Sequence, residues 1–323
     1  MIKPNLYVTR LLPKPAMDKL QEYFNLTVNL DDRVLTPSEI LKNIKGKDAL
    51  LCLLTDTIDK CILDASTNLK VISNYAVGFN NIDVQEATRR GIPVCNTPGI
   101  LTETTADLTW GLLLSIARHI VESDAFTRTG NFKGWAPLDF LGTDIYGKTL
   151  GIVGMGRIGE AVARRARGFN MTLLYTSRTP KDIPDAQCVS LKTLLEKSDF
   201  VTLHTPLSTE THHLIGTQEL QLMKPSAYLI NTTRGPVIDE KALVYALQNN
   251  LIAGAGLDVY EHEPELTEGL ALLHNTVLLP HIGSATTETR TAMGIMAAEN
   301  AIAIFKGEKP HSIANPEVLA ITT

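Results

Sequence analysis

A glycine pattern near the middle of the chain has the spacing needed to bind the phosphates of a dinucleotide. Gly154, Gly156 and Gly159 follow the apolar run 149–153 and precede a helical stretch. The first glycine permits a tight turn, the second lets the backbone approach a pyrophosphate, and the third lets the helix pack on the strand. Another strand-like run, 171–176, follows at the distance of a βαβ unit, which favours a cofactor site over a structural turn. The predicted site comprises Gly154, Gly156, Arg157, Ile158 and Gly159.

The residues after the 171–176 run bear on which dinucleotide is bound. An NAD site usually has an Asp or Glu about 20 residues beyond the glycines, where it binds the ribose 2′-hydroxyl. This sequence has Ser177, Arg178 and Thr179 there, with no acid. A hydroxyl and a guanidinium group suit a 2′-phosphate. We therefore predict a preference for NADP (NADPH), with NAD as the alternative.

Three charged residues follow later strand-like runs. Arg234, Glu263 and His281 each come shortly after an apolar run. The carboxyl ends of parallel strands meet at one edge of a sheet, so these side chains are expected to converge there. An arginine suits anion binding, and a histidine beside a carboxylate suits proton transfer.

Strand-like and helical segments alternate along the chain without hairpin turns. Strand-like runs lie at 5–9, 26–30, 49–54, 71–75 and 92–95, and helical patterns at 14–23, 36–44, 83–90, 102–127 and 288–305. Parallel strands need crossovers, which helices supply. The pattern predicts an α/β fold with doubly wound parallel sheets.

Length and composition exclude several classes of protein. The 323 residues suggest two domains, and 30 Lys and Arg against 35 Asp and Glu give a net charge of −5. No nucleic-acid partner is expected from this balance. The most apolar long segment, 108–120, is too short and too polar for a membrane span, and no export signal is visible.

The cysteines indicate no metal site. Cys52, Cys61, Cys95 and Cys188 are widely spaced, and the chain has no CxxC or Cys/His cluster. We expect reduced thiols in the core of a cytoplasmic protein.

Four motifs resemble those of the D-isomer-specific 2-hydroxyacid dehydrogenases, and most closely those of the glyoxylate/hydroxypyruvate reductases. They are GMGRIG at 154–159, NTTRGPVIDE at 231–240, DVYEHEP at 258–264 and PHIGSA at 280–285. The resemblance covers nearly the whole chain. It implies NADPH-dependent reduction of a small 2-keto acid, glyoxylate or hydroxypyruvate, to the D-2-hydroxy acid.

The resemblance also implies roles for individual residues. Arg234 would bind the substrate carboxylate and polarise its carbonyl, while His281, paired with Glu263, would donate the proton. Glu261 is the competing acid, and we expect it to be solvated. The resemblance places Leu54, Val77 and Gly78 at the substrate, together with Arg234 and His281, and Thr104, Thr232 and Asp258 at the cofactor.

The family architecture predicts two domains. A Rossmann cofactor domain, 100–283, would be inserted into a flavodoxin-like substrate domain made of 1–99 and 284–323. Members of the family are usually homodimers that associate through the segment here spanning 102–146. Trp135 would anchor that contact, unless it is a core tryptophan.

Alternatives remain for function and for three histidines. D-3-phosphoglycerate dehydrogenase is the rival enzyme, and a nucleotide-sensing corepressor-like binding protein is the rival of another class. His204 would flank the adenosine or serve a structural role. His212 and His213 have no identifiable partner and are expected to be exposed.

Overall fold

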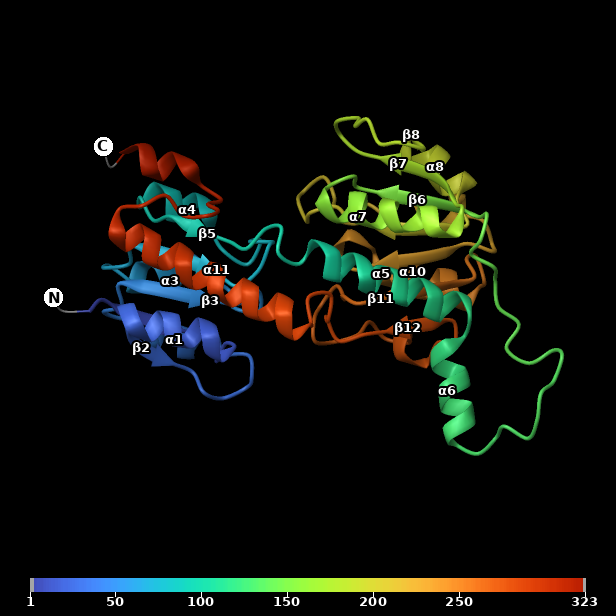
Figure 1. Cartoon of the computed structure of the whole chain (residues 1–323), viewed down its shortest axis with the longest axis horizontal. Coiled ribbons are helices and arrows are strands. Elements are labelled where there is room, and N and C mark those ends of the chain that lie inside the picture. The colour runs from blue at the N-terminus through green and yellow to red at the C-terminus, as the bar shows by residue number, and fades with distance from the viewer. Residues whose placement is uncertain (1–2, 322–323) are drawn as a thin grey trace. The chain divides into compact units, whose positions relative to one another are not determined.

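The computed structural model describes residues 3–321, which form two units (Figure 1). The first unit contains the described residues up to Leu101 and those from Ser284 onward, and the second is Thr102–Gly283. Each unit is a parallel sheet covered by helices on both faces, so the predicted α/β fold with two doubly wound sheets is confirmed. Within residues 3–321, no helix has both the length and the apolar character required to cross a bilayer.

The sheet of the first unit has five parallel strands in the order β2-β1-β3-β4-β5, which is the flavodoxin-like order. The strands are β1 (Asn5–Val8), β2 (Asn25–Val28), β3 (Ala49–Cys52), β4 (Val71–Asn74) and β5 (Val94–Cys95). Every residue of β3 and β4 is buried. Strand β3 therefore reads as an apolar run, as expected for a strand covered on two faces. Strand β4 ends in two buried polar residues, Ser73 and Asn74, whose side chains donate hydrogen bonds to the carbonyls of Ala297 and Gly78.

Helices cover both faces of this sheet. They are α1 (Lys14–Tyr23), α2 (Pro37–Asn43), α3 (Lys60–Ala65), α4 (Val84–Arg89) and α11 (Thr287–Lys306), followed by the 3₁₀ helix η4 (Pro316–Ile321). One core lies under α1 and α11, and another lies under α2, α3 and α4. Helices α1 and α11 pack closely because Gly294 has no side chain. A Cβ there would lie 2.8 Å from the Cβ of Ala16.

The second unit has seven parallel strands in the order β12-β11-β10-β9-β6-β7-β8. The strands are β6 (Thr149–Val153), β7 (Thr172–Thr176), β8 (Ala186–Cys188), β9 (Phe200–Leu203), β10 (Tyr228–Asn231), β11 (Gly254–Leu257) and β12 (Thr276–Leu278). The strand order reverses between β6 and β9. Ligands of such sheets bind outside the carboxyl ends of the strands at this switch point.

Helices α5 (Thr102–Ala117) and α7 (Arg157–Ala166) pack against each other over one core of this unit. The other core lies under α8 (Leu191–Lys197), α9 (Thr217–Leu222) and α10 (Glu240–Gln248). Three 3₁₀ turns complete the unit: η1 (Arg167–Phe169), η2 (Gly235–Val237) and η3 (Leu270–Leu272). Trp110 of α5 stacks on Phe169 with ring centroids 4.7 Å apart, which joins α5 to the end of α7.

The prediction of one helix from Thr102 to Thr127 is wrong. Helix α5 ends at Ala117, and a separate helix, α6 (Ile120–Arg128), follows His119, whose φ of 52° is left-handed. Helix α6 has no buried side chain, so burial in a core does not hold it in line with α5. Residue types did not predict this break, because it falls on a histidine rather than on Gly or Pro.

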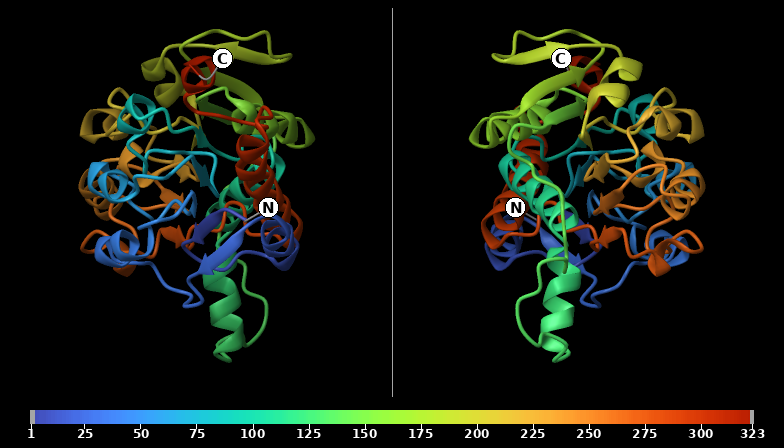
Figure 2. Two further views of the ribbon diagram at one scale, coloured as in Figure 1. Left: turned by 90° about the vertical axis from the view of Figure 1, so that its left-hand side faces the viewer. Right: turned by 90° about the vertical axis from the view of Figure 1, so that its right-hand side faces the viewer.

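Helix α6 and the loop that follows it, to Tyr146, form an arm that projects from the seven-stranded sheet in both views of Figure 2. Trp135 in this loop is 84 % exposed, so its interpretation as a core residue is wrong.

The cysteine prediction is only half correct. Cys52 and Cys95 are buried, but Cys61 and Cys188 are exposed, and all four are unpaired thiols.

Candidate active site

The glycine turn between β6 and α7 has the backbone geometry expected for a phosphate-binding loop. Gly154 has a φ of +98°, and a Cβ there would lie 2.7 Å from backbone atoms of His204. A Cβ at Gly159 would lie 2.2 Å from the carbonyl oxygen of Gly154. Gly156, the N-cap residue of α7, has open space where its Cβ would be. Gly154 and Gly159 thus serve packing, and Gly156 leaves the backbone open to a ligand at the N-terminus of α7.

Unsatisfied polar atoms lie beside this turn. The Nε2 atom of His204 and the Oγ1 atom of Thr205 are buried, and neither has a hydrogen-bond partner within residues 3–321. Burial lowers the pKa of His204 to about 3, so its ring is neutral. Enclosed polar atoms need partners, and here they adjoin a glycine cradle at the switch point of the sheet. These features fit a dinucleotide.

The predicted 2′-phosphate residues occupy the turn after β7. The Ser177 hydroxyl donates a hydrogen bond to the carbonyl oxygen of Thr179 at 2.7 Å, which closes the turn. Arg178 and Thr179 are exposed. The charge of Arg178 contributes to lowering the pKa of Glu210, after the larger effects of hydrogen bonds from the Ser208 hydroxyl and the Glu210 backbone.

His281 and Glu263 contact each other at the carboxyl edge of the sheet. The Nδ1 atom of His281, after β12, lies 2.9 Å from Oε2 of Glu263, after β11. The backbone N–H of Tyr260 donates to the other carboxylate oxygen, Oε1, at 3.1 Å. Burial raises the pKa of Glu263, but the hydrogen bond and charge of His281, the Tyr260 amide and the charge of Arg234 outweigh burial and lower it. The pair is therefore a carboxylate that orients an imidazole.

The segment that carries His281 is fixed by Asp258. Both oxygens of this buried carboxylate accept backbone hydrogen bonds, from Ile282 and from Gly283, each at 2.7 Å. His281 itself has a left-handed φ of 54°, which costs about 1–3 kcal/mol in a residue with a side chain. Two hydrogen bonds to a charged acceptor, worth about 1.5–3 kcal/mol each, offset that cost. Asp258 thus positions the segment that carries His281. The role expected for Asp258, at the cofactor, did not include these contacts.

Arg234 enters the same edge from the loop after β10. Its Nη1 atom donates to the carbonyl oxygen of Thr233 at 2.7 Å. Burial lowers the pKa of Arg234, and the nearby charge of Glu263 opposes that shift. The side chain of Asn231 shapes the loop by donating to the Arg234 carbonyl and accepting from the Thr233 N–H, each at 3.0 Å. The structure therefore places Arg234, Glu263 and His281 at one edge of the sheet, in the segments that follow the adjacent strands β10, β11 and β12.

Gly235 determines how closely these loops approach. A Cβ at Gly235 would lie 1.8 Å from the backbone C and O atoms of Tyr260 and 2.3 Å from the backbone N of Glu261. Only a glycine allows the loop that carries Arg234 to lie against the segment that leads to Glu263.

Glu261 is not solvated, and the expectation that His213 has no partner is wrong. The Glu261 carboxylate accepts from His213 Nε2 at 2.7 Å and from the backbone N–H of Glu240 at 3.2 Å. His213 is half-buried, whereas His212 is exposed as predicted. The buried carboxylate of Glu240, which the sequence reading missed, accepts from the backbone N–H of Glu261 at 2.7 Å. Glu261 therefore faces away from His281 toward its own partners, and Glu263 is the acid that contacts His281.

Two further predicted cofactor residues lie in the second unit. Thr232 is buried, and its hydroxyl lies 2.9 Å from that of Thr109 in α5. Thr104 is half-buried in the first turns of α5.

The predicted substrate residues Leu54, Val77 and Gly78 lie in two loops of the first unit. Asn81, which the sequence reading missed, joins these loops: its Nδ2 donates to the carbonyls of Leu53 and Asp56, each at 3.0 Å. Its Oδ1 accepts from Asn74 at 3.2 Å, and Asn74 also donates to the Gly78 carbonyl at 2.9 Å. No spacing rule marks Asn81, because its partners come from other strand ends.

A protein-family model and individual relatives match this chain. The model, described as the D-isomer specific 2-hydroxyacid dehydrogenase, NAD binding domain, matches residues 110–283. A glyoxylate reductase of Thermococcus litoralis is 50 % identical over 326 residues, covering 98 % of each chain. A glyoxylate reductase of Korarchaeum cryptofilum is 49 % identical, covering 99 % of this chain and 98 % of the relative.

Solved structures show the same fold. The TT0316 protein of Thermus thermophilus superposes with a TM-score of 0.91 at 46 % identity, covering 96 % of this chain and 99 % of that one. An NADPH-dependent glyoxylate/hydroxypyruvate reductase of Sinorhizobium meliloti, in complex with NADP and malonate, gives a TM-score of 0.86 at 33 % identity and covers 97 % of each chain.

Proposed function

Since the chain belongs to the D-isomer-specific 2-hydroxyacid dehydrogenases and is an NAD(P)-dependent oxidoreductase, we propose that it reduces glyoxylate or hydroxypyruvate to the D-2-hydroxy acid with a preference for NADPH. The observation that carries the proposal is the 2.9 Å contact between His281 and Glu263, with Arg234 on the neighbouring strand end. The names of the relatives favour glyoxylate among short 2-keto acids.

Each member of the triad has a distinct role in this reaction. When bound, the reduced nicotinamide supplies a hydride to C2 of the keto acid. Arg234 binds the substrate carboxylate and stabilises the negative charge that develops on the keto oxygen. Glu263 accepts the hydrogen bond from Nδ1 of His281, which leaves Nε2 as the nitrogen that transfers the proton to that oxygen. In the reverse reaction, neutral His281 is the base.

The proposed cofactor contacts begin at the glycine turn. Backbone N–H groups at Gly156, Arg157 and Ile158, with the helix dipole of α7, bind the pyrophosphate. Ser177, Arg178 and Thr179 bind the 2′-phosphate of NADPH. Thr104, Thr232 and Asp258 complete the cofactor site, and His204 supports the turn by packing against Gly154.

In this proposal the substrate site includes the loop that carries Leu54 and the loop that carries Val77 and Gly78. Backbone amides at Val77 and Gly78 bind the carboxylate, and Leu54 contacts the small organic end. The hydrogen bonds of Asn81 support this assignment because they hold the Leu53–Asp56 turn and the 77–81 loop in one arrangement.

We also propose that the protein is a homodimer in the cytoplasm. The arm 120–146 exposes large apolar side chains, a surface that monomers rarely keep. They are Ile120, Val121, Phe132, Trp135, Leu138, Phe140, Leu141 and Tyr146. The unpaired thiols support a reducing compartment.

Sedimentation equilibrium of the intact protein and of a Trp135→Asp/Leu138→Asp variant tests whether the protein is a dimer. A monomeric native protein would refute it.

Initial rates of NADPH and NADH oxidation test the reaction, with glyoxylate, hydroxypyruvate, pyruvate and 3-phosphohydroxypyruvate as acceptors. We expect the fastest turnover with NADPH and one of the first two acceptors. A preference for 3-phosphohydroxypyruvate would identify a phosphoglycerate dehydrogenase. The absence of turnover with every acceptor would favour the corepressor-like binding protein.

Two variants test the roles of the triad. Arg234→Ala should impair use of the keto acid severely while NADPH binding is retained, and His281→Ala should mainly lower the rate of the chemical step. Unchanged turnover in either variant would refute the assignment.

A further inference from the structure

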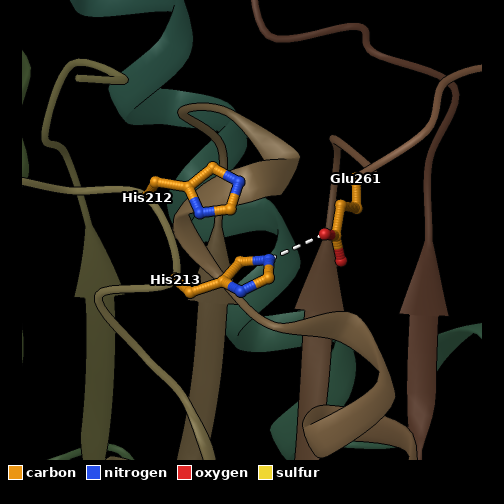
Figure 3. A group of neighbouring side chains, drawn as sticks. All are labelled: His212, His213 and Glu261. Atoms are coloured by element: carbon orange, nitrogen blue, oxygen red, sulfur yellow. Dashed lines mark hydrogen bonds and ion pairs between the residues drawn. The ribbon is translucent and has the colours of Figure 1, made fainter. Parts of the chain in front are cut away.

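His212, His213 and Glu261 gather potential metal ligands outside the catalytic triad. The two histidines precede α9, and Glu261 follows β11 (Figure 3). One nitrogen of each ring and one carboxylate oxygen all lie within 4.8 Å of one another. The imidazole rings stack with centroids 4.0 Å apart, and Figure 3 shows the His213 ring directed at the carboxylate of Glu261.

We propose that these three side chains bind a divalent first-row transition-metal ion of the zinc type. Two imidazole nitrogens and one carboxylate oxygen are a ligand set that Zn²⁺ accepts in proteins. Mg²⁺ and Ca²⁺ prefer oxygen ligands throughout, so the two histidines select against them.

Two of the three ligand atoms require only a small adjustment to admit the ion, and the His212 nitrogen starts within 4.8 Å of both. Ligand atoms about 2.0–2.2 Å from a tetrahedral Zn²⁺ are roughly 3.3 Å apart. His213 Nε2 and Glu261 Oε1 are 2.7 Å apart, so their separation must grow by roughly 0.6 Å, within reach of side-chain rotation. His212 is exposed, which leaves it free to turn toward the ion and gives solvent access to a fourth position.

The carboxylate ligand is held in place by a second layer of hydrogen bonds. Glu261 Oε2 accepts from the backbone N–H of Glu240 at 3.2 Å, and the Glu261 N–H donates to Glu240 Oε1 at 2.7 Å. Glu240 is buried, and its Oε2 accepts from the Thr267 hydroxyl at 2.8 Å. Supporting contacts of this kind orient metal ligands.

The histidine segment is also attached to the rest of the unit. The backbone N–H of His213 donates to the Pro236 carbonyl at 2.8 Å, and Ile215 pairs with Ile238 in a parallel bridge. A bound ion would therefore link this segment to the loop after β11 on a scaffold that is already formed. Its expected effect is to stabilise the second unit against unfolding.

The decisive variant is His212→Ala. His212 is exposed and its removal leaves the His213–Glu261 contact intact, so the variant is expected to fold and to keep its rate in metal-free buffer. A purely structural ion pair between His213 and Glu261 would not depend on His212. Metal binding would, because it loses one of three ligands.

Equilibrium dialysis and thermal unfolding of the full chain with Zn²⁺ measure the effect. A Cys61→Ser/Cys188→Ser background removes the two exposed thiols, which bind zinc themselves. We expect one Zn²⁺ per chain and a Tm that rises with Zn²⁺ concentration. In His212→Ala the affinity should fall at least about tenfold, so the same rise in Tm should require at least about tenfold more Zn²⁺.

Two control variants locate the ion. His311→Ala is a matched control, since His311 contacts Glu299 at 3.0 Å in a comparable exposed pair of the other unit, and it should bind Zn²⁺ as the parent does. His281→Ala should also retain the ion. Zinc affinity that is equal in His212→Ala and the parent, or no zinc binding by the parent, would overturn the proposal. So would loss of the ion in His281→Ala with retention in His212→Ala.

Discussion

Replacing Gly235 with alanine tests whether the close approach of two loops sets the geometry of the triad. The added Cβ would lie 1.8 Å from backbone C and O atoms of Tyr260, whereas side-chain Cβ atoms essentially never come closer than 3.0 Å. The loop that carries Arg234 must therefore move by about 1.2 Å from the segment that leads to Glu263. Both partners are backbone, so no flexible side chain can absorb the shift.

The magnitude of the effect follows from that displacement. A misplacement of about 1 Å in a catalytic group can cost about 100-fold in rate, which corresponds to about 2.7 kcal/mol. We therefore expect kcat/KM for the keto acid to fall at least about 100-fold in Gly235→Ala. Overpacking should also lower the free energy of unfolding by about 1–3 kcal/mol.

Steady-state rates with NADPH and glyoxylate, together with urea unfolding, measure both effects. Gly168→Ala is the matched control, because a Cβ there meets no atom within 4 Å, and it should behave like the parent. Because the glycine turn of 154–159 belongs to another loop, any change in NADPH affinity should be smaller than the fall in kcat/KM. A Gly235→Ala protein with parental kcat/KM and stability would refute the reasoning.

Three further perturbations have defined outcomes. Ser177→Asp with Arg178→Asp should shift the ratio of NADPH to NADH rates toward NADH by at least about tenfold, and an unaltered ratio would show that this turn does not contact the 2′-position. Glu263 has a lowered folded pKa, so its stabilising contribution should be complete above its unfolded pKa of about 4.3 and be lost as the pH falls through the folded value. Urea unfolding across this acidic range should show a weaker pH dependence in Glu263→Gln, and an identical dependence would contradict the ion pair. Asn81→Ala removes two hydrogen bonds of 3.0 Å, so unfolding should become easier by about 1–3 kcal/mol and KM for the keto acid should rise while KM for NADPH stays unchanged. Equal changes in both KM values would instead indicate general loosening.

Local spacing was enough to predict most elements and the candidate cofactor turn. The helix Lys14–Tyr23 lies where its periodicity placed it, and the helical pattern of 36–44 forms α2, which a capping box between Thr36 and Glu39 begins. The glycines of 154–159 occupy the predicted strand–turn–helix. These features depend on contacts within a few residues, which the order of residue types specifies directly.

Convergence at the strand ends was predictable for a related reason. Once β10, β11 and β12 are parallel neighbours, Arg234, Glu263 and His281 must follow their carboxyl ends along one edge. The choice of Glu263 over Glu261 rested on a motif at the sequence level. The structure supplied its cause, because Glu261 is occupied by His213 and Glu240.

Only the tertiary structure revealed the supporting contacts and the irregular backbone. The break at His119, the exposed Trp135, and the bonds made by Asp258, Asn81 and Glu240 have no signature in residue spacing. Each depends on the packing of segments distant in the chain, or, at the arm, on the lack of such packing. The sequence by itself therefore determined which elements form and which reactive side chains reach one edge of a sheet. Long-range packing decided how those side chains are oriented and held.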